Sequence, residues 1–168
     1  MTSDDLHNLL DYHYWARDRV LDAAAQLTSE QFVRDMGSSF RSVRDTLAHI
    51  YGADLVWYLR WTGTSPTSLV AADRFGDVAA LAGDWADLEK KVRPYVAGLD
   101  EADIARVFEY RALNGTPGAS PFWQMLQHVV NHASYHRGQV TTMIRQLGGQ
   151  PARSLDLIAF YRERAQLK

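Results

Sequence analysis

Apolar residues recur at intervals of three, four and seven along four long stretches of the chain, which is the spacing of amphipathic helices. The sequence therefore predicts four helices, over residues 3–27, 42–62, 77–98 and 120–147. The last of these stretches has the longest continuous pattern. A shorter helix is expected over 154–166, and the apolar residues that it carries are Leu155, Ile158, Ala159 and Tyr161.

Polar residues and a proline indicate where these helices begin. Ser3 and Ser120 can cap the first and fourth helices, with Pro121 at the first helical position of the fourth. Ser42 opens an S-x-x-D version of the capping box at the start of the second helix. Near the end of the third helix, Pro94 is expected to kink or shorten it.

The connections between the predicted helices are long. Residues 28–32 read as a short helical turn, and 63–74 as a loop. Residues 106–112 alternate apolar and polar positions, and a turn signal follows at 114–118, so a short irregular hairpin is expected. Four amphipathic helices with almost no strand predict an all-α fold, a four-helix bundle in which at least one connection crosses over the bundle.

Composition and charge limit the possible functions. A chain of 168 residues has the size of one domain, so we expect a single domain over 1–168. The 18 Lys+Arg and 20 Asp+Glu give a formal net charge of −2, which argues against a nucleic-acid partner. No segment reads as a secretory signal or a membrane span, which predicts a cytoplasmic protein with no membrane partner.

The absence of cysteine excludes disulfides, thiolate nucleophiles and iron–sulfur clusters, so any metal must be bound by His, Asp or Glu. No histidine follows a glutamate by three positions, which excludes the usual di-iron bundle motif. The sequence also contains no G-x-S-x-G, Walker A or G-x-G-x-x-G motif. Histidine chemistry is what remains.

Three of the six histidines, His128, His132 and His136, follow one another at intervals of four within the predicted helix 120–147. Two imidazoles at i and i+4 lie one turn apart and can reach one ion from the same side. On a helical wheel His136 lies inside the apolar stripe, His132 on its shoulder and His128 further out. The glutamate base of an H-E-x-x-H protease is missing, because Ala133 follows His132.

A metal site needs a third ligand from another helix, and His49, in the middle of the predicted helix 42–62, is the best candidate. The wheel does not place His49 at the centre of its apolar stripe and does not select it over His13. His7, His13 and His128 are each more simply read as structural or surface residues. For His132 and His136, a metal role and a structural role stay equally open.

Asp54 falls on the apolar seam of the predicted helix 42–62, where a carboxylate must be paired. The simpler interpretation is a buried ion pair with Arg137 or Arg17. The alternative is a carboxylate near the metal that orients a ligand histidine.

Three segments together resemble the DinB/YfiT-like family of metal-dependent helical bundles, which is unrelated to the polymerase of similar name. Residues 11–21, DYHYWARDRVL, resemble its first helix, and residues 39–63, SFRSVRDTLAHIYGADLVWYLRWTG, resemble its second. The most specific segment is 131–149, NHASYHRGQVTTMIRQLGG, with its His-x-x-x-His-Arg-Gly-Gln sequence. The likeness extends over nearly the whole chain.

The resemblance implies a four-helix bundle in up-down-down-up order with a long crossover, and a homodimer. It also implies a divalent metal bound by three histidines, which match His49, His132 and His136; zinc is the first choice and nickel the second. His128 matches a position that is often histidine without being the usual ligand. His13 and Arg17 stand where relatives often have asparagine, so this side of the pocket departs from the family pattern.

Relatives with assigned activities imply a metal-dependent thiol S-transferase that joins a low-molecular-weight thiol to an electrophilic small molecule; a hydrolase is also possible within the family. Asp54, His128, Tyr135 and Arg137 are the side chains that could assist, and the sequence assigns a role to none of them. The alternative is a non-catalytic metal-binding protein with a stress-response or interaction role. A bundle that has lost its metal ranks last, because all three matched histidines are present.

Overall fold

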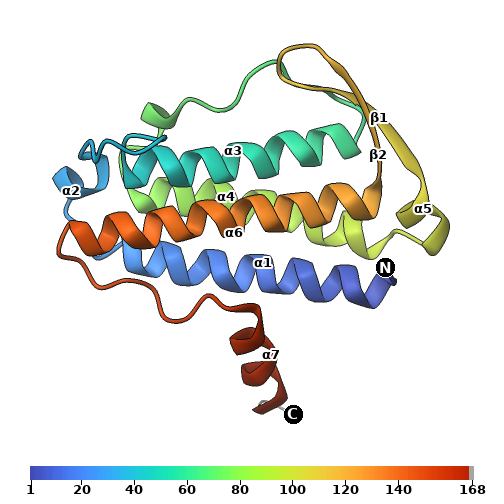
Figure 1. Ribbon diagram of the computed structural model, residues 1–168. Coiled ribbons are helices and arrows are strands. Elements are labelled where there is room, and N and C mark those ends of the chain that lie inside the picture. The colour runs from blue at the N-terminus through green and yellow to red at the C-terminus, as the bar shows by residue number, and fades with distance from the viewer. Residues whose placement is uncertain (167–168) are drawn as a thin grey trace.

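The computed structural model describes residues 1–166, and the chain is mostly helical (Figure 1). The four long helices are α1 (Ser3–Ala24), α3 (Val43–Trp61), α4 (Val78–Ala97) and α6 (Phe122–Gln146). Helix α1 packs against α6 and α4, and α3 packs against the same two helices. The four predicted long helices are therefore present and lie side by side.

The ends of two helices differ from the prediction. Thr2, not Ser3, caps α1, because its hydroxyl accepts from the Asp5 amide while the Asp5 carboxylate accepts from the Thr2 amide. Helix α6 begins at Phe122 rather than at Ser120, because Ser120 belongs to a strand. The Ser42 cap of α3 is confirmed.

Helix α4 has its N-cap at Asp77 and runs through Pro94 to Ala97. Pro94 therefore does not shorten α4. Gly98 follows as the C-cap and donates to the carbonyl of Pro94, which satisfies one of the acceptors that a helix leaves free at this end.

Short elements connect the long helices. Helix α2 (Ser29–Val33) confirms the predicted helical turn, a single 3-10 turn, η1 (Ala72–Arg74), lies in the long connection after α3, and α5 (Glu101–Ala105) was not predicted. The predicted hairpin is present as antiparallel β1 (Val107–Arg111) and β2 (Pro117–Pro121). Strand β2 leads directly into α6, so the hairpin lies at the same end of the bundle as the start of α6 (Figure 1).

The C-terminal helix α7 (Leu157–Gln166) begins three residues later than predicted and buries a different face. Phe160 is its buried residue and packs against the rings of Tyr12 and Trp15 on α1. Ile158 and Tyr161, which the sequence placed among its apolar residues, are 56% and 42% exposed. Helix α7 therefore packs on α1 through Phe160, and ion pairs of Glu163 with Arg19 and of Arg164 with Asp11 add to this contact.

A strongly polar contact lies in the core between the four long helices. His13 of α1 and Asp54 of α3 are both buried, and His13 Nε2 lies 2.7 Å from Asp54 Oδ2. The indole N–H of Trp85, on α4, donates to the same carboxylate oxygen at 2.9 Å. One carboxylate thus joins three helices, which orients α1, α3 and α4 relative to one another.

This pairing corrects the expected partners of Asp54, which were Arg137 or Arg17. Arg17 lies one turn further along α1 and pairs with Asp18 and Glu89. Arg137 donates to the hydroxyl of Ser134 on its own helix. Asp54 pairs with His13 because the imidazole of His13 is the polar group of α1 that lies opposite it.

Among residues 1–166, no helix is both long enough and apolar enough to cross a membrane.

Replacing Asp54 with alanine is expected to lower the free energy of unfolding by about 3 kcal/mol, because it leaves the Trp85 N–H and the His13 ring buried without an acceptor. Urea unfolding of the metal-free protein measures the change. Asp84→Ala, which removes the carboxylate of a surface ion pair with Arg74, is the matched control and should cost less than about 1 kcal/mol. Equal effects of the two substitutions would show that the buried contact contributes no more than a surface pair.

Candidate metal centre

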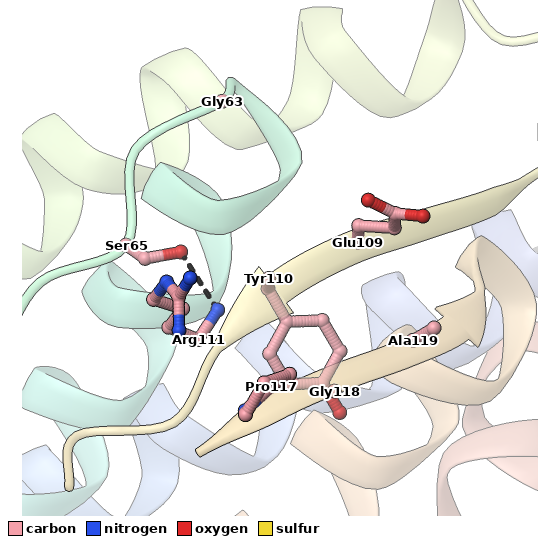
Figure 2. Close-up of a pocket in the computed structure, with 8 residues that line it drawn as sticks. All are labelled: Gly63, Ser65, Glu109, Tyr110, Arg111, Pro117, Gly118 and Ala119. Carbon is pink, nitrogen blue, oxygen red and sulfur yellow. Dashed lines mark hydrogen bonds between the residues drawn. The ribbon is translucent and has the colours of Figure 1, made fainter. Parts of the chain in front are cut away.

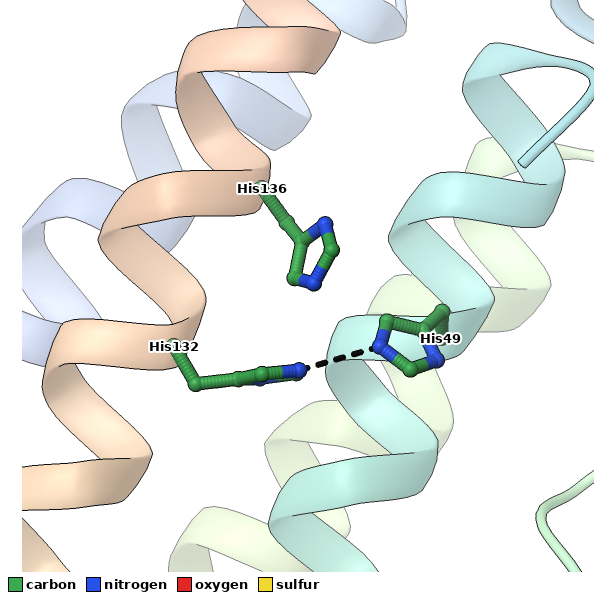
Figure 3. Close-up of side chains that lie close together, drawn as sticks. All are labelled: His49, His132 and His136. Carbon is green, nitrogen blue, oxygen red and sulfur yellow. Dashed lines mark hydrogen bonds between the residues drawn. The ribbon is translucent and has the colours of Figure 1, made fainter. Parts of the chain in front are cut away.

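Three histidine side chains meet where α3 packs against α6. His49 comes from α3, and His132 and His136 come from successive turns of α6, with all three rings directed into the space between the helices (Figure 3). The Nε2 atoms of His49 and His132 are 3.0 Å apart. One ligand atom from each of the three residues lies within 4.8 Å of the others. The three histidines that the sequence singled out are therefore brought together.

Helical geometry accounts for this grouping. The four-residue spacing stacks His132 above His136 on one face of α6, and packing against α3 brings His49 opposite both. The ring centroid of His136 is 4.5 Å from that of His132 and 4.7 Å from that of His49.

Gln139 fixes the orientation of His136. The Nδ1 atom of His136 is 2.7 Å from the Oε1 atom of Gln139, one turn further along α6. Because Oε1 can only accept, Nδ1 donates to it, and Nε2 is the nitrogen left to bind a metal ion. A partner on the outer nitrogen is the usual way in which proteins orient a metal-binding imidazole.

His49 and His132 are held in the neutral form. Burial is the main cause that lowers the pKa of each ring to about 4, and the neighbouring His136 lowers both further. Neutral imidazole is the form that binds a metal ion, so neither ring needs to lose a proton at neutral pH.

The residues present fit a divalent metal ion. Zinc held by imidazoles at about 2.0–2.1 Å keeps its ligand atoms roughly 3.4 Å apart, and the observed separations, 3.0 Å for one pair and none above 4.8 Å, lie around that value. Three nitrogen ligands without a carboxylate suit zinc or nickel and leave a further coordination position open. His49 differs from His136 in having no partner that orients its ring: its Nδ1 atom is buried and forms no hydrogen bond with residues 1–166.

Phe40 covers one side of the three histidines. It lies between α2 and α3, and its ring stacks on His49 with a centroid separation of 4.0 Å and meets the edge of His136 at 5.3 Å. Sequence reasoning missed Phe40 because residues 34–41 have no periodic pattern to indicate which side chain turns inward. A single aromatic residue in a polar loop was the only signal available.

His128 lies on the other side of the group and outside it. Its ring centroid is 5.7 Å from that of His132 and 5.3 Å from the ring of Trp57. The side chain is exposed, as the wheel predicted. Burial of part of the ring, together with the positive charge of Arg60, lowers the pKa of His128.

The other side chains considered from sequence are not members of the three-histidine group. His13 and Asp54 form the core pair described above. Tyr135 is 67% exposed, although its ring borders that of His136 at 5.0 Å. Arg137 is buried on the opposite side, with its guanidinium 5.5 Å from the centre of the Tyr12 ring. None of them forms part of the three-histidine group.

A separate hollow of about 640 Å³ lies over the hairpin, and Figure 2 shows the side chains around it. No histidine lines it. Its lining residues are Gly63, Ser65, Glu109, Tyr110, Arg111, Pro117, Gly118 and Ala119. It is therefore not the space around the three histidines.

Comparisons with known proteins agree with the fold and the resemblance. A family model described as the DinB family matches residues 1–163. Protein DinB from Bacillus subtilis (strain 168) is 27% identical over 151 residues, which is 87% of this chain and 88% of that protein. The crystal structure of a DinB-like protein from Bacillus cereus ATCC 10987 superposes with a TM-score of 0.60 at 19% identity, covering 87% of this chain and 95% of that one.

Zinc added to the metal-free protein at a hundred times its dissociation constant should stabilise the fold by about 2.7 kcal/mol. For a chain of this size that corresponds to a rise of about 5–10 °C in the melting temperature. Differential scanning fluorimetry of untagged protein measures it. The His49→Ala, His132→Ala and His136→Ala variants should lose the rise, and His128→Ala should keep it. A rise that survives all three substitutions would place the metal elsewhere.

Proposed function

The chain belongs to the DinB family, and we propose that it binds one divalent metal ion through His49, His132 and His136. The observation that carries this proposal is the meeting of three imidazole nitrogens from two helices within 4.8 Å. Zinc is the first candidate because it readily accepts four-coordinate nitrogen sites, and nickel is the second.

Gln139 and Phe40 would support such a site without binding the metal themselves. Gln139 keeps the Nε2 lone pair of His136 directed inward, and Phe40 shields the ring of His49 from water on one side. Burial keeps His49 and His132 neutral at physiological pH. A bound divalent ion supplies Lewis acidity, which lowers the pKa of a thiol or water molecule at the open position.

The activity that we propose is thiol-dependent transfer onto an electrophilic small molecule. The thiol gives up its proton to solvent, its sulfur forms a bond to the electrophilic carbon, and the leaving group departs with its electron pair. Support comes from the family resemblance and from a set of three protein ligands, the number typical of catalytic rather than structural zinc sites. A low-molecular-weight thiol is the proposed co-substrate.

A metal-binding protein without catalysis is the second candidate. Phe40 favours it, because a ring stacked at 4.0 Å on His49 narrows the approach of a substrate from that side. In this case the site would serve a stress-response or interaction role.

The up-down-down-up helix order belongs to the same proposal. Its support is visible in Figure 1, where α3 and α4 both begin at the end of the bundle near α2, while α1 and α6 begin at the opposite end. The chain between α3 and α4 returns along the outside of the bundle in the same view. A homodimer is proposed from the family resemblance alone.

The thiol-transfer proposal predicts turnover by the zinc-loaded protein with 1-chloro-2,4-dinitrobenzene and one of three thiols: bacillithiol, mycothiol or glutathione. The rate should fall at least about tenfold in His136→Ala, since it loses a ligand of the proposed site, and should be retained in His7→Ala, a histidine of α1 outside it. Product is followed by absorbance with the uncatalysed rate subtracted. Equal rates in wild type and His136→Ala would leave the non-catalytic candidate.

A further inference from the structure

Arg60, near the end of α3, carries a buried cation that pairs with no acidic side chain among residues 1–166. The residue is 8% exposed, and its guanidinium forms no hydrogen bond or ion pair within that range, although its backbone carbonyl accepts from the amide of Gly63. Its Nε atom is fully enclosed and unpartnered. Arg17, which is buried to a similar degree, pairs instead with two carboxylates. A buried charge without a counter-ion lowers the stability of the fold, which suggests that Arg60 has a functional role.

Two aromatic rings hold the guanidinium in place. Its central carbon lies 4.6 Å from the ring centre of Trp57 and 5.0 Å from that of Tyr110. Such cation–π contacts fix the orientation of an arginine and offset part of its desolvation, but they leave its hydrogen-bond donors free. Burial lowers the pKa of Arg60, and the guanidinium still stays charged at neutral pH.

The hairpin supplies Tyr110 without supplying a counter-charge. Alternation along β1 turns Phe108 and Tyr110 toward the bundle and leaves Glu109 exposed on the other face, as Figure 2 shows for Glu109 and Tyr110. Tyr110 can lie flat on the partner strand because Gly118 has no side chain there: a Cβ atom would stand 2.7 Å from the Tyr110 ring. The positive charge therefore stays uncompensated.

The donors of Arg60 that remain free are within reach of a ligand. Nε is enclosed, but the two terminal nitrogens are not among the fully buried atoms without partners, so they contact solvent. Two parallel N–H groups at the end of a guanidinium match the two oxygens of a carboxylate. A guanidinium whose stem is buried and whose terminal nitrogens keep some contact with solvent can bind such an anion at its end.

Arg60 is connected to the three histidines by a continuous aromatic surface. Trp57, which lies under the guanidinium, is followed by the ring of His128 at 5.3 Å, and His128 by that of His132 at 5.7 Å. No acidic side chain forms an ion pair or a hydrogen bond with His128 or Arg60 among the described residues. A row of neighbouring rings thus leads from the histidines to the guanidinium of Arg60.

We propose that Arg60 binds a carboxylate of the small-molecule thiol, at the far end of a surface formed by His128, Trp57 and Tyr110 that begins at the three-histidine group. This inference rests on the proposed function for the identity of the ligand as a thiol. It narrows the co-substrate to thiols that carry a carboxylate several bonds from the sulfur. Arg60 thereby acts as a specificity-determining residue.

Binding of S-methylglutathione to the metal-free protein tests the proposal without metal or turnover. This thioether has the two carboxylates of glutathione and no reactive thiol, and its diethyl ester has the same skeleton without the negative charges. The side-chain Nε–H resonance of Arg60, followed by ¹H–¹⁵N NMR at low salt, is the readout. We expect it to shift with S-methylglutathione, to be unmoved by the ester, and to lose the effect at high salt.

Substitutions then assign the effect to Arg60. Arg60→Met, which keeps the length of the side chain and removes its charge, should weaken binding of S-methylglutathione at least tenfold by calorimetry. Arg111→Gln removes one positive charge from the exposed face of the same hairpin and should leave the affinity unchanged. If Arg60→Met fails to fold, Arg60→Lys keeps the charge but not the fork, and should bind several-fold more weakly than wild type.

Three results would overturn the proposal: no shift of the Arg60 resonance with S-methylglutathione, equal binding of the ester, or unchanged affinity in the Arg60 variant that folds. Because the titration needs neither metal nor chemistry, its failure is separate from failure of the proposed function. Anion binding in a protein that takes up no metal would support the Arg60 site and reject the thiol-transfer activity.

Discussion

The packing of α3 against α6 is the contact on which the proposed chemistry depends. Helical spacing alone places His132 and His136 one above the other, but two imidazoles hold an ion poorly. Only the register of α3 against α6 brings His49 to 3.0 Å from His132. A slide of about one helical turn, roughly 5.4 Å, would move His49 out of reach of both partners.

Polar contacts inside the core help to fix this register. Asp54, five residues beyond His49 on α3, receives hydrogen bonds from α1 and α4 through His13 and Trp85. Apolar packing is tolerant of small slides, whereas a buried carboxylate with two defined partners is not. The same helix therefore carries its site residue and its positioning contact close together, which favours a preformed group of histidines.

Burial around the histidines gives the site its second property. Phe40 on one side and the helices on the other remove water from His49 and His132, so both rings are neutral at physiological pH. Further along α3, burial does not make Arg60 neutral, because a guanidinium keeps its proton at this pH. Arg60 is therefore charged, and it has no counter-ion among the described residues. A neutral metal-binding group and a fixed cation at the two ends of one aromatic surface suit a ligand with a soft donor at one end and an anion at the other.

Sequence periodicity was sufficient for the long helices and for the pairing of His132 with His136, because both depend on local spacing. His49 was chosen for its place in the middle of the predicted second helix, and the family resemblance supported that choice; its half-buried side chain explains why the wheel did not select it. The predicted partner of Asp54 was wrong because the actual partner, His13, depends on how α1 is rotated against α3. Phe40 was missed because it lies in a loop without a periodic pattern. Arg60 was missed because one of the rings against it, Tyr110, comes from a hairpin distant in sequence.

The most direct test of the account is a crystal structure of the zinc-soaked, untagged protein with anomalous data collected on both sides of the zinc edge. The account predicts one strong anomalous peak between α3 and α6, at about 2.0–2.1 Å from a nitrogen of each of His49, His132 and His136. A peak elsewhere, or an empty site with His49 and His132 still hydrogen-bonded to each other, would contradict it.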